Sequence, residues 1–103
     1  DGEGLRARVS GWAKTDEGVT VYNVEVTLRD GSRKLIRRRY NQFASLHDQL
    51  KRQYAPVSTF PFPNKLHLSR DVVRRRCERF DQYLKLLLSL EPPAPEFFEW
   101  LNT

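Results

Sequence analysis

The residues best suited to chemistry lie in a basic run at positions 33–43, with the sequence Arg-Lys-Leu-Ile-Arg-Arg-Arg-Tyr-Asn-Gln-Phe. Five of these eleven residues are basic, and the run begins like a β-strand and ends like the start of a helix. Arginine binds phosphate oxygens through two parallel hydrogen bonds. Arginines gathered where a strand gives way to a helix therefore suggest a receptor for an anion.

A second set of arginines lies in a predicted long helix and comprises Arg74, Arg75, Arg76 and Arg79. At about 100° per residue, the core face of this helix carries Val73, Cys77, Phe80, Leu84, Leu87 and Leu88. Arg76 borders that face, whereas the other arginines point away from it. A charge at the edge of a core must be paired or must reach solvent. We therefore expect Arg76 to pair with an internal carboxylate such as Asp48, to extend into solvent, or to bind an external polar ligand.

The elements that must position these arginines follow the order β-β-β-α-loop-α-α, which is typical of an α+β fold. We expect three strands, at residues 5–14, 19–29 and 34–39. Turn signals separate them at residues 15–18 and at Asp30-Gly31. The spacing of the valines shifts between Val21 and Val24, which indicates a β-bulge in the second strand. The strands therefore form a three-stranded antiparallel β-meander.

A helical subdomain follows the meander, with a proline-rich loop between its first two main helices. Asn41 is the expected N-cap of the first helix, and its apolar face carries Phe43, Leu46, Leu50 and Tyr54. A proline-rich segment, residues 56–68, comes next and is expected to be extended. Ser69 caps the following helix, which runs to about Leu90, and Pro95 opens a short last helix.

Length and composition limit the class of protein. The 103 residues form one domain, with residues 1–4 as the edge of a linker. The net charge of +5 and the pI of about 9.7 favour an acidic partner, such as a nucleic acid, an anionic membrane or an acidic protein surface. The single cysteine, Cys77, excludes an intrachain disulfide and favours a reducing, cytoplasmic compartment. The longest nearly apolar stretch, Tyr83–Leu90, falls far short of the roughly 20 residues that span a bilayer.

No catalytic or metal-binding arrangement is evident in the sequence. His47 and His67 are the only histidines, and neither lies at metal-ligand spacing from Cys77 or from the other. Cys77 falls within the core stripe, so we expect a packed thiol rather than a nucleophile. No glycine-rich phosphate loop is present. We therefore expect no enzymatic activity, no cofactor and no metal.

Two kinds of anion fit the basic run. Nucleic-acid bases could stack on Tyr40, Phe60 and Phe62, but the sheet carries few aromatic residues and the element order matches no nucleic-acid-binding fold. An anionic lipid headgroup fits better. Tyr40 offers a flat apolar face to a sugar ring, and Lys65 adds a positive charge from the proline-rich loop. We therefore expect a membrane partner and no nucleic acid.

Two leucines beside this cationic cluster are candidates for membrane insertion. Leu66 and Leu68 alternate with His67 and have no evident helical or strand partner. Each CH₂ group buried in the interface contributes about 0.8 kcal/mol. The alternative is that both side chains fold back onto the core. Trp12, near the first turn, is a weaker candidate for the same role.

These features together resemble a PX (phox homology) domain, the phosphoinositide-binding module of sorting nexins and oxidase subunits. The resemblance covers essentially the whole chain. It rests on the meander, on the run Arg38-Arg39-Tyr40-Asn41-Gln42-Phe43, on the sequence Pro63-Asn64-Lys65, and on an arginine seven residues before Tyr83.

The resemblance implies a role for four residues. By analogy with members that bind phosphatidylinositol 3-phosphate, Arg39 of this chain would hold the 3-phosphate. The ring of Tyr40 would lie under the inositol. Lys65 would meet the 1-phosphate, and Arg76 would bond the 4- and 5-hydroxyls. The implied function is a module that recognises phosphatidylinositol 3-phosphate on endosomal membranes.

Some features leave alternatives open. Thr59 and Phe62 replace the first two prolines of the family's Pro-x-x-Pro-Pro-x-Lys run, which weakens the case for binding SH3 domains. Arg37 and Arg38 could admit a bisphosphorylated phosphoinositide, and the domain could instead serve mainly for protein contacts. Less specific attraction to anionic lipid is expected from Arg37, Arg38, Lys51, Arg52, Arg70, Arg74 and Arg75.

Overall fold

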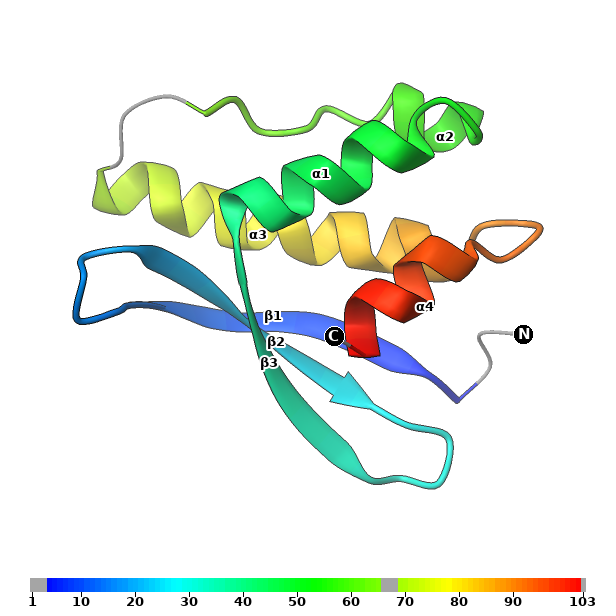
Figure 1. Ribbon diagram of the computed structural model, residues 1–103, viewed down its shortest axis with the longest axis horizontal. Coiled ribbons are helices and arrows are strands. Elements are labelled where there is room, and N and C mark those ends of the chain that lie inside the picture. The colour runs from blue at the N-terminus through cyan, green and yellow to red at the C-terminus, as the bar shows by residue number, and fades with distance from the viewer. Residues whose placement is uncertain (1–3, 66–68, 103) are drawn as a thin grey trace.

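The computed structural model describes residues 4–65 and 69–102, and confirms the predicted α+β class (Figure 1). Figure 1 shows the helices gathered on one side of the sheet. The elements are β1 (Arg6–Lys14), β2 (Thr20–Thr27), β3 (Arg33–Arg39), α1 (Tyr40–Leu50), α2 (Ala55–Ser58), α3 (Arg70–Leu88) and α4 (Pro95–Asn102). None of the described helices combines the length and apolar character of a membrane span.

The sheet has the order β1-β2-β3 with antiparallel neighbours, as the meander predicted. Its register shift, however, lies between Val9 and Gly11 of β1, so the expectation of a bulge in β2 was wrong. The shift comes at the place opposite Val24, but the extra residue belongs to the edge strand. An edge strand accommodates an extra residue readily because one side of it has no ladder to maintain. The neighbouring N–H of Val9 donates to Asp81 of α3 at 2.9 Å.

Helix α1 begins one residue earlier than its predicted cap. Arg39 is the N-cap and Asn41 lies in the first turn, so the assignment of Asn41 as N-cap was wrong. The Arg39 backbone N–H donates to Oε1 of Gln42 at 2.8 Å. This back-bond from the third helical residue satisfies the N-cap donor without a Ser, Thr, Asp or Asn side chain at the cap. Arg39 is therefore both the last residue of β3 and the N-cap of α1.

The other helices follow the prediction with two differences. Ser69 caps α3 as expected, since its Oγ accepts from the N–H of Val72 at 3.2 Å. Helix α3 ends at Leu88, two residues before the predicted end. The one-turn helix α2 (Ala55–Ser58) overlaps the start of the segment, residues 56–68, that we expected to be extended. Its Pro56 sits in the first turn, where a proline needs no N–H partner.

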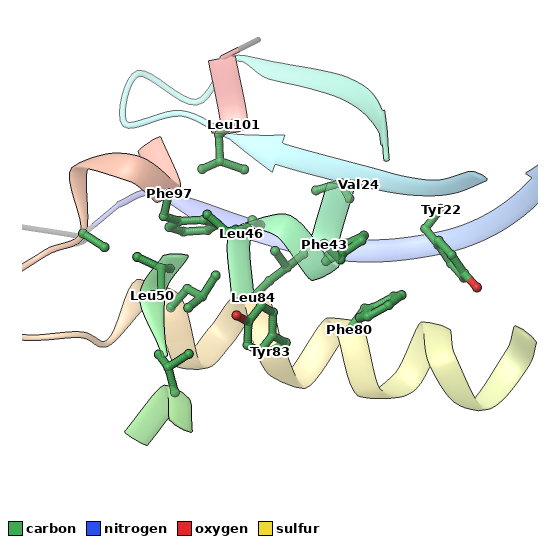
Figure 2. Close-up of a cluster of buried hydrophobic side chains, with 14 of the residues drawn as sticks. Tyr22, Val24, Phe43, Leu46, Leu50, Phe80, Tyr83, Leu84, Phe97 and Leu101 are labelled. Carbon is green, nitrogen blue, oxygen red and sulfur yellow. The ribbon is translucent and has the colours of Figure 1, made fainter. Parts of the chain in front are cut away.

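The core joins β2, α1 and α3 through aromatic rings (Figure 2). Phe43 of α1 and Phe80 of α3 are stacked with their ring centroids 3.9 Å apart, and Tyr22 of β2 meets Phe80 edge-on at 5.0 Å. Truncation of such a ring costs about 3–5 kcal/mol. This cluster fixes the start of α1 beside the middle of α3. It thereby brings the end of the basic run towards the arginines of the long helix.

Candidate functional site

The junction of β3 and α1 places Arg39 and Tyr40 at consecutive positions with different environments. Arg39 is exposed at the end of the strand. Tyr40 is half-buried and lies against Phe62 and Phe80, with ring centroids 5.9 and 6.1 Å away. Its hydroxyl donates to the carbonyl of Pro63, and burial raises the pKa of this hydroxyl. Tyr40 therefore links the first helix to the proline-rich loop.

Arg76 is almost fully buried, with 4% of its surface exposed. Its Nη2 donates to the carbonyl of Asn64 at 2.6 Å, and its guanidinium carbon lies 4.7 Å from the centroid of the Tyr40 ring. The Asp48 carboxylate pairs with Lys51 at 3.1 Å. The loop carbonyl and the aromatic ring thus hold the guanidinium group that the helical phase had singled out.

Lys65 closes the same arrangement from the loop. Its Nζ donates to Oδ1 of Asn41 at 2.8 Å, which brings the ammonium group to the first turn of α1. Tyr40 and Arg76 are thus in direct contact, Lys65 bonds Asn41, the residue that follows Tyr40, and Arg39 precedes Tyr40 along the chain. Three segments that are remote in sequence meet at this point. Lys65 and Arg39 are both exposed there, so their charges are accessible to an anion.

A hollow of about 290 Å³ lies next to Arg76, between α3 and the proline-rich loop. It is lined by Pro61, Pro63, Asn64, Val72, Arg75, Arg76 and Arg79. Of the four residues implied by the resemblance, only Arg76 lines this hollow. The sequence analysis did not include Arg75 or Arg79 in the headgroup site, because both lie off the core face of the helix. Their four-residue spacing, which puts them on one helix face with Arg76 and Val72, was the signal that could have found them.

Arg38 is a correction to the sequence analysis. It was expected to be a charge available to lipid, but only 6% of its surface is exposed. Its Nη1 donates to the carbonyl of Arg37 at 2.9 Å, and its Nη2 donates to the carbonyl of Trp100 at 2.7 Å. Its guanidinium carbon also lies 5.1 Å from the centroid of the Trp100 ring, and burial lowers its pKa. Arg38 therefore anchors α4 to β3 and does not face a bilayer.

His47 and Cys77, which were considered for catalysis or metal binding, both lie in the packed interior of the domain or at its edge. Nδ1 of His47 lies 3.0 Å from the hydroxyl of Tyr83, and its ring stacks on Phe62 at 4.3 Å. Burial lowers the pKa of His47 and raises that of the Cys77 thiol to about 11. Within residues 4–65 and 69–102, no three His, Cys, Asp or Glu side chains gather where they could hold a metal ion. The predicted insertion residues Leu66 and Leu68 lie outside the described residues.

The arrangement of the end of β3, the proline-rich loop and α3 is accompanied by a match to a known family. The family model described as PX domain matches residues 26–100. The chain belongs to the PX domain family. PX domains are phosphoinositide-binding modules that act at membranes and are not catalytic, and this chain is a module of that kind.

Two solved PX domains have the same fold. A designed CISK-PX domain matches with a TM-score of 0.80 and covers 95% of this chain and 99% of that one, at 21% identity. The mouse SNX19 PX domain, which was solved with a bound sulphate ion, matches with a TM-score of 0.62 and covers 94% of each chain, also at 21% identity. Identity this low supports the fold alone.

The curated relatives are larger proteins than this PX domain. The mouse phosphatidylinositol 3-kinase C2 domain-containing subunit gamma is 30% identical over 84 residues, which cover 81% of this chain and 5% of that protein. Sorting nexin-3 of Schizosaccharomyces pombe is 36% identical over 55 residues, or 50% of this chain and 38% of that protein. Mouse neutrophil cytosol factor 4 is 34% identical over 80 residues, or 68% and 24%. This PX domain therefore spans well under half the length of these relatives.

Proposed function

We propose that this PX domain recognises phosphatidylinositol 3-phosphate through Arg39, Tyr40, Lys65 and Arg76. The observation that carries the proposal is the placement of Arg76. Its guanidinium group lies over the Tyr40 ring and bonds the loop carbonyl of Asn64, one residue before Lys65. The three segments that would hold the headgroup are thus fixed to one another before any ligand arrives, which lowers the entropy cost of binding.

Each of the four residues has a distinct part in the proposed complex. Arg39 is exposed and binds the 3-phosphate through its two-pronged guanidinium group. Lys65 supplies a compact positive charge for the 1-phosphate. Tyr40 presents apolar ring surface to the inositol, and Arg76 bonds the 4- and 5-hydroxyls. The sulphate bound to the mouse SNX19 PX domain supports the view that this fold can hold a tetrahedral oxyanion.

The same proposal places the domain on endosomal membranes, facing them from the cytoplasm. Leu66 and Leu68 would enter the interface, next to Lys65 in the sequence. Attraction to anionic lipid would be added by the exposed residues Arg37, Lys51, Arg52, Arg70, Arg74 and Arg75. Arg38 is withdrawn from this set because it is buried against Trp100. The burial of Arg38 also weakens the alternative of a bisphosphorylated headgroup. Arg37 and Arg38 were the two arginines invoked for the additional phosphate, and Arg38 contacts Trp100 instead.

Vesicle sedimentation with a panel of all mono- and bisphosphorylated phosphoinositides tests the proposal. We expect the highest affinity for phosphatidylinositol 3-phosphate, and a loss of about tenfold or more in Arg39→Ala, because a charged fork to the phosphate is removed. Arg33→Ala is the matched control, since it removes an exposed arginine at the opposite end of β3 from Arg39. Equal binding by Arg39→Ala and the wild type would disprove the assignment. A preference for a bisphosphorylated phosphoinositide would show that this lipid, and not phosphatidylinositol 3-phosphate, is the ligand of the site.

A further inference from the structure

The two edges of the sheet differ in how they are covered. The edge strand β1 packs against α3, and the N–H of Val9 donates to Asp81 of that helix at 2.9 Å. The opposite edge is β3, which has β2 as its one neighbour among the described strands (Figure 1). An open strand edge presents backbone N–H and C=O groups that can pair with another extended chain. The direction of the backbone groups of β3 therefore decides what this edge can bind.

The hydrogen bonds at the two ends of β3 show which backbone groups point outward. In an antiparallel pair, alternate residues bond the neighbouring strand, and the residues between them point away from it. At the hairpin, the N–H of Leu28 donates to the carbonyl of Ser32 at 2.8 Å, so Ser32 and, by alternation, the even-numbered residues of β3 bond β2. At the other end, the N–H of Arg39 donates to the side chain of Gln42 and not to β2. The odd-numbered residues therefore direct their backbone groups away from β2.

The open stretch of this edge runs from Arg33 to the N–H of Arg37. The outward backbone groups of Arg33 and Leu35 have no hydrogen-bond partner in the described part of the chain. The carbonyl of Arg37 accepts from the side chain of Arg38 at 2.9 Å, which closes the edge at that residue. Donors and acceptors repeated at every second residue match the backbone of an extended polypeptide better than they match a lipid headgroup or an ion.

The charges beside this stretch specify the kind of polypeptide. Arg33, Leu35 and Arg37 alternate along the strand and are all exposed, so they share one face. Neither arginine has a carboxylate partner within residues 4–65 and 69–102. Glu25, which lies opposite Leu35 in β2, pairs with Arg8 of β1 at 3.2 Å. The two arginines of β3 are therefore available to the acidic side chains of a partner.

Leu35 adds an apolar position between the two arginines. With 55% of its surface exposed, it is the one large hydrophobic side chain that is exposed among the described residues. Side chains on neighbouring strands pair residue by residue on each face of a sheet. A strand beside β3 would therefore place an acidic side chain opposite each arginine and an apolar side chain opposite Leu35. These three side chains would be separated by single residues of any type.

We propose that β3 binds an extended acidic segment of a partner protein, which adds to the sheet as a fourth strand. The backbone of the segment pairs with the outward groups of Arg33 and Leu35, and its acidic side chains bond Arg33 and Arg37. This surface shares no residue with the four that we propose for phosphatidylinositol 3-phosphate. The two proposals can therefore fail separately.

The first experiment is an NMR titration of the whole chain with a synthetic peptide, Thr-Glu-Thr-Val-Thr-Glu-Thr, blocked at both ends. We expect saturable shifts of the amides of residues 33–37 and slower hydrogen exchange of the Leu35 N–H, which the peptide would cover. A matched peptide with lysine in place of both glutamates should bind at least about tenfold more weakly. The absence of saturable shifts with the glutamate peptide, or equal binding of the lysine peptide, would overturn the proposal.

Leu35→Pro separates strand pairing from charge. It removes the outward N–H at this position and no bond to β2, and edge strands tolerate proline where the N–H faces solvent. Affinity for the glutamate peptide should fall by about fivefold. Leu35→Val retains the N–H and should stay within about twofold of wild type. Unchanged affinity in Leu35→Pro would show that the peptide does not pair with the strand. Vesicles that contain phosphatidylinositol 3-phosphate should bind Leu35→Pro as they bind the wild type.

Arg33→Gln combined with Arg37→Gln tests the contribution of charge. Affinity for the glutamate peptide should fall by about tenfold or more, because two charged hydrogen bonds are lost. Arg52→Gln combined with Arg70→Gln is the matched control, since it removes the same charge from exposed positions outside β3. An equal loss in the two double variants would reduce the effect to diffuse charge and overturn the proposal. Thermal unfolding shows whether Leu35→Pro is folded, and the exposed arginine pair keeps the test decisive if it is not.

Discussion

The end of β3 and the middle of α3 each carry three consecutive arginines, Arg37–Arg39 and Arg74–Arg76, and each buries one of them. In both places the buried guanidinium group donates to a backbone carbonyl and lies over an aromatic ring. Arg38 uses Trp100 of α4, whereas Arg76 uses Tyr40 and the proline-rich loop. The same residue type in the same kind of contact therefore serves two purposes. One contact fixes the C-terminal helix, and the other assembles the proposed headgroup site.

The difference shows that the period of the backbone decides which arginine is buried. Side chains alternate along a strand, so the middle arginine of the β3 run lies opposite to its two neighbours. Along α3, a step of about 100° turns Arg74 and Arg75 away while Arg76 returns to the edge of the core. Adjacent arginines are thus not interchangeable, and substitutions within each triplet can separate folding from binding.

The largest effect on binding is expected from Arg76→Met, which retains apolar bulk but removes the guanidinium donors. Affinity for phosphatidylinositol 3-phosphate should fall by about tenfold or more, measured by vesicle sedimentation. Arg38→Met is the matched control in the other triplet. Its affinity per folded molecule should remain within about twofold of wild type. An equal loss of affinity in Arg76→Met and Arg38→Met would contradict the view that only the α3 triplet contributes its buried arginine to binding.

The next effect is on stability and falls on Arg38. Arg38→Met removes the guanidinium group that donates to the partly buried carbonyl of Trp100, which should lower the free energy of unfolding by about 1–3 kcal/mol. Urea titration monitored by circular dichroism gives this value. Arg37→Met, one residue earlier and exposed, should change stability by no more than about 0.5 kcal/mol. A stable Arg38→Met protein would show that the other contacts of α4, such as the bond from the Trp100 indole N–H to the carbonyl of Gln42, hold the helix without Arg38.

A smaller effect is expected from Tyr40→Phe, which removes only the hydroxyl that bonds the carbonyl of Pro63. The ring under Arg76 is retained, so the free energy of unfolding should fall by about 0.5–1.5 kcal/mol. Binding should weaken by a few fold, because the loop that carries Lys65 loses one attachment to α1. Tyr54→Phe provides a control on a partly buried tyrosine outside the site. Tight binding by Tyr40→Phe would mean that Arg76 positions the loop without help.

The smallest effect is a pH dependence from His47, whose ring packs on Phe62 of the same loop. Burial lowers its pKa below the value of about 6.5 expected in the unfolded chain. The unfolded state therefore takes up the proton first as pH falls. Stability from the neutral imidazole is present above pH of about 6.5 and declines as pH falls towards the folded-state pKa. His47→Gln should flatten this part of a stability curve, whereas Arg38→Met should leave its slope unchanged.

The sequence predicted the parts of the structure that depend on local periodicity. The strands, the cap at Ser69 and the position of Arg76 at the core edge all follow from spacing within one element. The burial of Arg38 did not, because its partner Trp100 is 62 residues away and no local pattern reports that contact. The β1 bulge was misplaced for a related reason. The valine spacing of β2 recorded an irregularity in the ladder without saying which strand carried the extra residue.

The candidate site stays a prediction. The resemblance named four residues; in the structure Arg76 lies over the ring of Tyr40, and Lys65 bonds Asn41, the residue after Tyr40. Arg79 was not predicted to line the hollow beside Arg76, because a polar residue outside the core face has no distinctive pattern in a single sequence. Its place there depends on the proline-rich loop that lies opposite. Such features become visible only when the elements are packed together.

The position of β3 at the edge of the sheet has a consequence for a protein that gathers on membranes. Recruitment to a surface raises the local concentration of identical copies, and an open strand edge is a template for pairing with another copy. Five of the seven residues of β3 are basic. Two such strands brought side by side would repel each other before their backbones could pair. The charge of β3, part of which we propose attracts the domain to an anionic bilayer, would thus also protect the domain from aggregation when copies are crowded together.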